Sequence, residues 1–232
     1  MTGLGLADYD CGIIASGALL IYLKETQKTS LSHMSRLIPY AAGKYMLLDS
    51  STRRNLELCE TLREKQKRGS LLWVLDKTKT AMGARNLRKY IEQPLVQKYD
   101  IEKRLDALNE LLDNAISREE IREYLGPVYD LERLIGRITY KSANPRDLIA
   151  FRNSLKMLPF IRDILKEFHS AVLKEIHEDM DPLQDLYDLI ERAIVEEPPI
   201  VTREGGMIKE GYNEEADKLR HAKTEGKTWL AE

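Results

Sequence analysis

Residues 144–158 read Asn-Pro-Arg-Asp-Leu-Ile-Ala-Phe-Arg-Asn-Ser-Leu-Lys-Met-Leu, and this stretch indicates the fold class. Asn144 offers a side-chain cap, and Pro145 suits the first helical position because the N–H that it lacks would have no helical partner there. Apolar residues follow at helical spacing, at Leu148, Phe151, Leu155 and Leu158. The stretch therefore predicts an amphipathic helix with a buried face, and Pro159 predicts a kink or a restart.

The same helical pattern extends on both sides of this stretch. Caps for further helices are expected at Ser50 or Ser51, Ser70, Thr80, Asp100, Ser117 (with Glu120), Asp130, Asp181 and Asn213. In the helix after Asp100 we expect one apolar stripe, formed by Ile101, Leu105, Leu108 and Leu112. Residues 45–48 suggest a short strand, and Gly205-Gly206 suggests a small β-hairpin between Ile200 and Ile208. The sequence predicts a mainly α fold.

The N-terminal part reads differently from the rest. Cys11 to Gln27 suggests a helix in which small residues lie beside large apolar ones, so we expect it to be buried against another element. Its apolar run, Cys11 to Leu23, has 13 residues and is shorter than the roughly 20 that cross a bilayer. Pro39 and Gly43 then punctuate a linker, which places a domain boundary near residue 40.

The charge of the chain is almost balanced but unevenly distributed. The 232 residues hold 36 Lys and Arg against 38 Asp and Glu, which argues against a histone-like protein. Residues 50–99 contain twelve basic and five acidic residues, whereas residues 167–217 contain four basic and fifteen acidic ones. Cys11 and Cys59 are the two cysteines of the chain, so no disulfide framework is expected. The low cysteine content indicates the reducing environment of the cell interior.

The sequence contains no complete motif for catalysis or for cofactor binding. Gly226-Lys227-Thr228 resembles the end of a phosphate-binding loop, but His221 stands where that loop needs its first glycine. The four histidines are not paired at helical spacing and no thiolate pair exists, so no zinc site is expected. We therefore expect no catalytic, cofactor-binding or metal-binding residue and no enzymatic activity.

Basic residues provide the remaining candidates. Arg63, Lys65, Lys67 and Arg68 form a charged connection that could contact DNA phosphates. Aromatic residues for base stacking are scarce beside them, since Trp73 is expected in the core. A stand-alone helical module that binds duplex DNA through residues 50–99 is thus one hypothesis, and a helical scaffold is the other.

Several ordered blocks of the chain resemble one family, the MutS DNA mismatch-repair ATPases. The blocks are Asp49-Ser50-Ser51-Thr52-Arg53-Arg54-Asn55-Leu56-Glu57-Leu58, Leu71 to Asp76 with Thr78, Thr80, Met82-Gly83 and Arg85, Gln93-Pro94-Leu95, Asp130 to Leu134, Asn144 to Leu148, Pro198-Pro199, Gly205-Gly206, and Gly211-Tyr212-Asn213 with Glu214 and Leu219. Upstream, Ala18-Leu19-Leu20 with Tyr22-Leu23 and Thr26-Gln27 resembles the last helix of the family's connector domain.

The resemblance implies a domain arrangement. Residues 1–40 would be the C-terminal part of the connector domain with its linker, and residues 41–232 the first segment of the multi-helical core, or lever, domain up to the clamp insertion. At the junction of the two stand Asp49, Thr52, Arg53, Arg54 and Asn55. For the two arginines and Asn55 we favour capping and salt bridging at that junction over a signalling role.

The resemblance also implies a function. The parent protein would bind mismatched double-stranded DNA and hydrolyse ATP with Mg²⁺, as a bacterial-type cytoplasmic homodimer that associates with the nucleoid through DNA, recruits a MutL-type partner and has no membrane contact. The family's mismatch-reading, clamp and ATPase motifs match no position of this chain. In the family, the core helices act as levers, so the resemblance implies that this chain connects the other domains and transmits conformational signals between them.

Overall fold

The computed structural model describes the backbone of residues 10–27 and 42–231. The chain divides into two compact units, residues 1–45 and residues 46–232. Each unit is described by itself.

The first unit contains the helix that the sequence predicts near the N-terminus. Helix α1 runs from Asp10 to Gln27, and a 3₁₀ turn, η2, spans Ala42–Lys44. None of the residues of α1 is buried, and Ile14 is 73% exposed. The expected burial is therefore wrong for this chain, because the described part of the unit offers α1 no second helix to pack against. Among the described residues, no helix combines the length and the apolarity that crossing a membrane requires.

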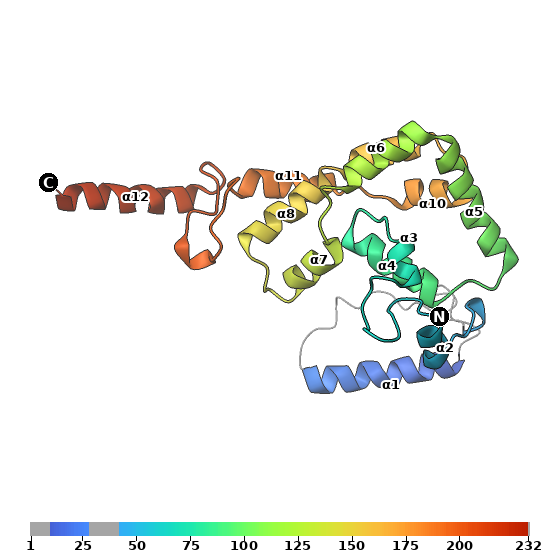
Figure 1. Cartoon of the computed structure of the whole chain (residues 1–232). Helices are drawn as coiled ribbons and strands as arrows, with labels where there is room; N and C mark the ends of the chain where they lie inside the picture. The colour runs from blue at the N-terminus through green and yellow to red at the C-terminus, as the bar shows by residue number, and fades with distance from the viewer. Residues whose placement is uncertain (1–9, 28–41, 232) are drawn as a thin grey trace. The chain divides into compact units, whose positions relative to one another are not determined.

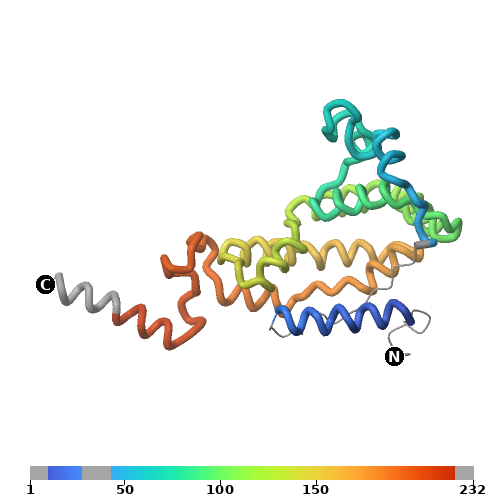
Figure 2. Tube along the Cα trace, turned by 90° about the horizontal axis from the view of Figure 1, so that it is seen from below, coloured from blue at the N-terminus to red at the C-terminus, as the bar shows by residue number. Residues whose placement is uncertain are grey.

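The second unit is built almost entirely from helices, which confirms the predicted fold class (Figures 1 and 2). In chain order they are α2 (Ser50–Asn55), α3 (Leu71–Leu75), α4 (Ala81–Glu92), α5 (Lys98–Asp113), α6 (Ala115–Leu125), α7 (Leu131–Thr139), α8 (Pro145–Leu155), α9 (Leu158–Leu165), α10 (Ala171–Asp179), α11 (Gln184–Ala193), η3 (Thr202–Glu204) and α12 (Glu214–Ala231).

Five of the predicted caps begin helices in the structure. Ser70, Thr80 and Asp130 accept hydrogen bonds from backbone N–H groups in the first turns of α3, α4 and α7. Asn213 does the same for α12, through the N–H of Ala216 at 2.9 Å. Asn144 forms a full capping box at α8, since it accepts from the Asp147 N–H at 2.8 Å and the Asp147 carboxylate accepts from the Asn144 N–H. These helix starts follow from local sequence alone.

The other predicted caps are displaced by one to three residues. Asp49, not Ser50 or Ser51, caps α2. Asp100 lies in the first turn of α5, which begins at Lys98 without a side-chain cap. Because the Asn114 backbone ends α5 and begins α6 at the same point, α6 begins at Ala115 rather than after Ser117. The Asp181 carboxylate accepts from the Leu183 N–H, so α11 begins only at Gln184.

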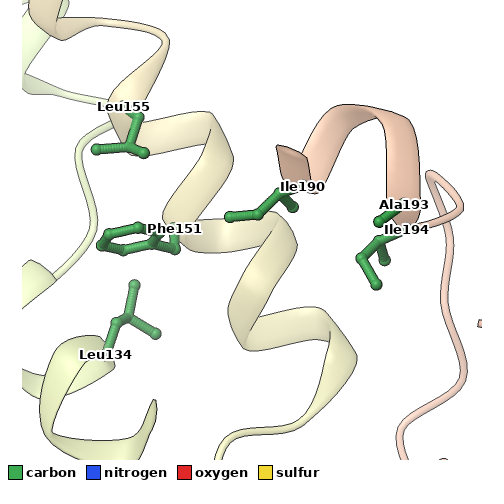
Figure 3. Packing of buried hydrophobic residues seen from close by; sticks show 6 residues of the cluster. All are labelled: Leu134, Phe151, Leu155, Ile190, Ala193 and Ile194. Carbon is green, nitrogen blue, oxygen red and sulfur yellow. The ribbon is translucent and has the colours of Figure 1, made fainter. Parts of the chain in front are cut away.

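One core cluster joins α7, α8 and α11. Its buried members are Leu134, Phe151, Leu155, Ile190, Ala193 and Ile194. Figure 3 shows Phe151 of α8 between Leu134 of α7 and Leu155 of its own helix, with Ile190 of α11 directed toward α8. Leu148 and Leu158 pack against the same cluster, so the predicted inner face of residues 144–158 is confirmed. Pro159 lies in the first turn of α9, where it restarts the helix.

A second cluster joins α5, α6, α9 and α10. It contains Ala107, Ile161, Leu165, Phe168 and Leu173. The face of α5 that packs here carries Ala107 and Leu111, whereas the predicted stripe is exposed, with Leu105 at 50% and Leu112 at 63%. The stripe was therefore the wrong face, because helical spacing alone does not show which of two apolar faces finds a partner.

The predicted β-hairpin between Ile200 and Ile208 is wrong. Gly205 and Gly206 have positive φ angles of 73° and 71° and do reverse the chain, but the residues before them form η3 instead of a strand. The returning chain pairs further back, in one antiparallel bridge between Ile194 and Ile208. The loop that closes this bridge is too long for a hairpin turn. The short strand predicted at residues 45–48 does not form either: Tyr45 is an isolated bridge residue, residues 46–48 are irregular, and the Met46 N–H donates to the Pro94 carbonyl at 2.8 Å.

Candidate functional site

The segment expected at a domain junction, Asp49 to Asn55, is held by its own cap. The Asp49 carboxylate accepts from the Thr52 N–H at 2.6 Å, and hydrogen bonds from Thr52 lower the pKa of Asp49. The Arg53 side chain turns back, and its Nε donates to the Leu48 carbonyl at 2.9 Å. Arg54 and Asn55 are exposed. The segment is thus a capped turn that presents two arginines and an amide.

Beside this segment lies a concave site with a volume of about 380 Å³, which we call the arginine cavity. Arg53 and Arg54 of α2 and Arg88 of α4 line it together with the carboxylates of Glu60 and Glu92. Cys59 also lines it, and burial raises the pKa of this thiol. Sequence reasoning found the α2 arginines but missed Arg88 and Glu92, because the folding of α4 against the loop after α2 cannot be read from spacing.

The basic connection between α2 and α3 is a compact loop. The Thr61 N–H donates to the Gln66 carbonyl at 2.9 Å and the Lys65 N–H to the Thr61 carbonyl at 3.1 Å. The four predicted phosphate-contacting residues, Arg63, Lys65, Lys67 and Arg68, are all exposed on it.

Lys67 differs from the other three basic residues because it is paired with Asp76. The hydrogen bond from Lys67, with further bonds from Thr78, lowers the pKa of Asp76 to about 2. The side chains of Arg63, Lys65 and Arg68 have no hydrogen-bond or ion-pair partner among the described residues. Three of the four candidates are thus available to an anion, and Lys67 holds the end of α3.

Ion pairs join successive helices of the second unit. Arg85 of α4 donates to both oxygens of Asp130, the cap of α7, at 2.6 and 2.8 Å, and it also pairs with Glu132. The hydrogen bond from Arg85 is the largest cause that lowers the pKa of Asp130. Arg137 of α7 donates to the Asp147 carboxylate of α8 at 2.8 Å. Together these contacts connect α4, α7 and α8.

The connection continues from α8 to α11. Arg152 of α8 has a side chain only 5% exposed, and it donates to Glu191 at 2.6 Å and to Glu196 at 2.7 and 2.8 Å. Arg146 Nε donates to the Pro198 carbonyl at 3.1 Å. A continuous series of charge-assisted hydrogen bonds therefore runs from α4 to the segment after α11.

The described residues contain no group of three or more His, Cys, Asp or Glu side chains placed to hold a metal ion. Gly226-Lys227-Thr228 lies inside α12, and its backbone is helical rather than a phosphate-wrapping loop. The geometry of the described residues thus defines a class: an all-α domain in which charged side chains link successive helices.

Comparison with known proteins identifies the family. The family model for MutS domain III matches residues 51–228, and the chain belongs to this family. The chain is 65% identical over all 232 residues to the DNA mismatch repair protein MutS of Lachnoclostridium phytofermentans. It is 53% identical over 228 residues to the protein of the same name from Ruminiclostridium cellulolyticum. It spans about a quarter of the length of these curated relatives, 25% and 26% respectively.

Proposed function

We propose that these residues form the helical core of a bacterial-type mismatch-repair protein and transmit conformational changes between its other domains. The observation that carries this proposal is the match to MutS domain III over residues 51–228, together with 65% identity along the whole chain to a MutS protein. Residues 1–40 would then close the connector domain, and residues 41–232 would be the first pass of the core.

The ion-pair series from α4 to α11 gives this proposal a physical basis. A scaffold passes a signal when a displacement at one end changes the free energy of an arrangement at the other end. The contacts of Arg85, Arg137 and Arg152 bind each helix to the next, and the buried cluster of α7, α8 and α11 lies beneath them. Movement of α4 would therefore shift α7, α8 and α11 as one body.

The chemistry would belong to other parts of the parent protein. We propose that the parent binds mismatched double-stranded DNA, hydrolyses ATP with Mg²⁺, acts as a cytoplasmic homodimer and recruits a MutL-type partner. Within this chain, no stretch supplies a glycine-rich phosphate-binding loop. The chain by itself would then be no enzyme.

A chimera tests this function. In the Lachnoclostridium phytofermentans MutS protein, the matching quarter is replaced by residues 1–232. The chimera is expressed in a bacterium in which the gene for its own MutS protein alone is deleted. Because cores tolerate substitution when volume and pattern are kept, we expect the mutation rate to return close to that of the unmodified protein. A folded chimera that leaves the mutation rate at the repair-deficient level would refute the proposal.

The second candidate, duplex DNA binding by residues 50–99, is favoured by the unpaired Arg63, Lys65 and Arg68 of the basic loop. Fluorescence anisotropy of the purified chain with matched and mismatched duplexes separates the two functions. As a scaffold, the chain should bind weakly and equally to both duplexes, with an affinity that falls steeply as salt rises. Sub-micromolar, mismatch-selective binding at physiological salt would favour the stand-alone module.

A further inference from the structure

The arginine cavity contains more positive groups than the described structure neutralises. Three arginines line it, and Arg88 is the one with a carboxylate partner, since its Nε donates to Glu92 Oε1 at 2.8 Å. Burial acts to raise the pKa of Glu92, but the hydrogen bonds from Arg88 and Cys59 and the charges of Arg88 and Arg53 together outweigh it, so the pKa is lowered. Arg88 and Glu92 therefore form a charged pair that cancels within the cavity wall.

Arg53 and Arg54 make no hydrogen bond or ion pair with a carboxylate among the described residues, although the charge of Arg53 contributes to lowering the pKa of Glu92. The Nε of Arg53 donates to the Leu48 carbonyl at 2.9 Å, which fixes the guanidinium plane and leaves its Nη groups without a partner among the described residues. The Arg54 side chain has no hydrogen-bond or ion-pair partner there, and Glu60 makes no ion pair with the three arginines, although its charge contributes to raising the pKa of Arg88. Each guanidinium is a planar fork of N–H donors of the kind that binds a carboxylate, and both arginines line the same cavity.

We propose that the arginine cavity binds one carboxylate of an acidic protein segment through Arg53 and Arg54. This inference rests on the proposed function, because a scaffold domain has neighbouring domains that can present an Asp or Glu side chain. It adds to that function a specific contact surface and the chemistry of the group that occupies it.

The charge of the cavity favours a single carboxylate over nucleic acid. Its wall holds three arginines but also Glu60 and Glu92, so the net positive charge is small. Duplex DNA carries one negative charge per roughly 1.7 Å of helix axis, so a phosphate seated on Arg54 would bring its neighbours toward the two carboxylates. A volume of about 380 Å³ leaves enough room for a side-chain carboxylate with its water.

An NMR titration of the chain tests the site. The Nε–Hε signals of Arg53 and Arg54 are followed in ¹⁵N-labelled protein while N-acetylglutamate amide is added, and N-acetylglutamine amide serves as the neutral control. We expect saturable shifts of both signals with the glutamate derivative and none with the glutamine derivative. Arg54→Gln should weaken the binding about tenfold, since it removes a charge-assisted hydrogen bond. Arg63→Gln, on the basic loop, should leave the affinity unchanged.

Three results would overturn the proposal. The first is the absence of any saturable shift, and the second is an equal response to the neutral control. The third is a shift of the same two signals at a lower concentration of inorganic phosphate or of a short duplex, which would assign the cavity to nucleic acid. The titration measures only carboxylate binding at the arginine cavity. A negative titration is therefore distinguishable from a chimera that does not restore mismatch repair.

Discussion

Arg152 shows how a charged residue can occupy a position in the core. Its stem lies in the interior while its guanidinium reaches Glu191 and Glu196, whose side chains stay 41% and 69% exposed. The hydrogen bond from Arg152 is the largest cause that lowers the pKa of Glu196. The sequence pattern around Phe151 marked the apolar face of this helix correctly, but it gave no sign of partners 39 and 44 residues away.

Replacing Arg152 by Met would keep the stem and remove the hydrogen bonds. We expect Arg152→Met to lower the free energy of unfolding by about 1.5–3 kcal/mol, the range for hydrogen bonds to charged groups. A larger loss is not expected because the two carboxylates remain hydrated. Urea denaturation measures the change, with Arg63→Met as the control at below about 0.5 kcal/mol, because the exposed Arg63 side chain has no partner among the described residues. A variant as stable as the unmodified chain would contradict this account of the network.

Gly69 and Gly136 offer a matched pair of alanine substitutions that tests the effect of backbone strain on stability. Gly69 has a φ of 95°, and a Cβ built there would lie 3.1 Å from Thr61 Cγ2. Gly136 lies within α7 with nothing within 4 Å of its Cβ position. We expect Gly69→Ala to lower the free energy of unfolding by about 1–3 kcal/mol and Gly136→Ala to raise it by about 0.5–1 kcal/mol. Denaturant titrations of the two variants should show opposite shifts, and equal shifts would exclude backbone strain as the cause.

At the scale of elements, the helix N-termini fall into two groups: those capped by a residue next to the helix and one capped by a residue far away in the sequence. Caps within the same turn, such as Thr80, Asp130 and Asn144, could be predicted because a hydroxyl, carboxylate or amide beside an apolar helix is a local signal. Helix α10 is different. Ser170 makes no side-chain cap, and the Glu110 carboxylate of α5 accepts the backbone N–H groups of His169 and Ser170 at 2.5 and 2.8 Å. No local pattern announces a cap that comes from 60 residues away.

This distant cap should make stability depend on pH. Burial acts to raise the pKa of Glu110, but the hydrogen bonds from Ser170 and His169 outweigh it, so the pKa lies below its ordinary 4.5. A carboxyl with a depressed folded-state pKa stabilises the protein above the unfolded value, and this contribution is lost as pH falls through the folded pKa. We expect the stability difference between the unmodified chain and Glu110→Gln to be constant above about pH 5 and to shrink in acid.

Urea denaturation between neutral pH and about pH 3 measures this difference. The matched control is Glu167→Gln, because the Glu167 side chain is exposed and makes no hydrogen bond or ion pair among the described residues. That variant should show no pH-dependent difference. A Glu110→Gln difference that stays constant down to pH 3 would show that the carboxylate charge does not stabilise α10.

At the scale of the whole molecule, the sequence predicted the helices and their order but not their partners. The apolar pattern of α8 identified its buried face, yet only the structure shows that this face meets α11 as well as α7. On α5, two apolar faces compete, and the one with Ala107 and Leu111 is used because α6, α9 and α10 converge on it. The arginine cavity could likewise be predicted only in part. Arg53 and Arg54 belong to a sequence motif, whereas Arg88 reaches the cavity only through the packing of α4.

The distribution of buried residues predicts an uneven stability along the chain. The two core clusters hold α5 to α11 together, whereas α1 has no buried residue and the described side chains of α12 have none, with Leu219 at 68% exposure. Polar contacts, such as the hydrogen bond from Arg220 to the Ile208 carbonyl at 3.1 Å, tie the start of α12 to the preceding chain, whereas most helical stability in proteins comes from the packing of an apolar face.

Hydrogen exchange monitored by mass spectrometry should therefore show slow exchange in α8, α9 and α11 and fast exchange in α1 and α12. Peptides from α8 and α12 of the same digest serve as internal controls for each other, so intrinsic exchange rates can be divided out. Exchange in α12 as slow as in α8 would mean that the helix is stabilised without partners outside this chain. The expected contrast would instead mark α1 and α12 as the elements that gain stability only when neighbouring domains cover them, as a scaffold between domains requires.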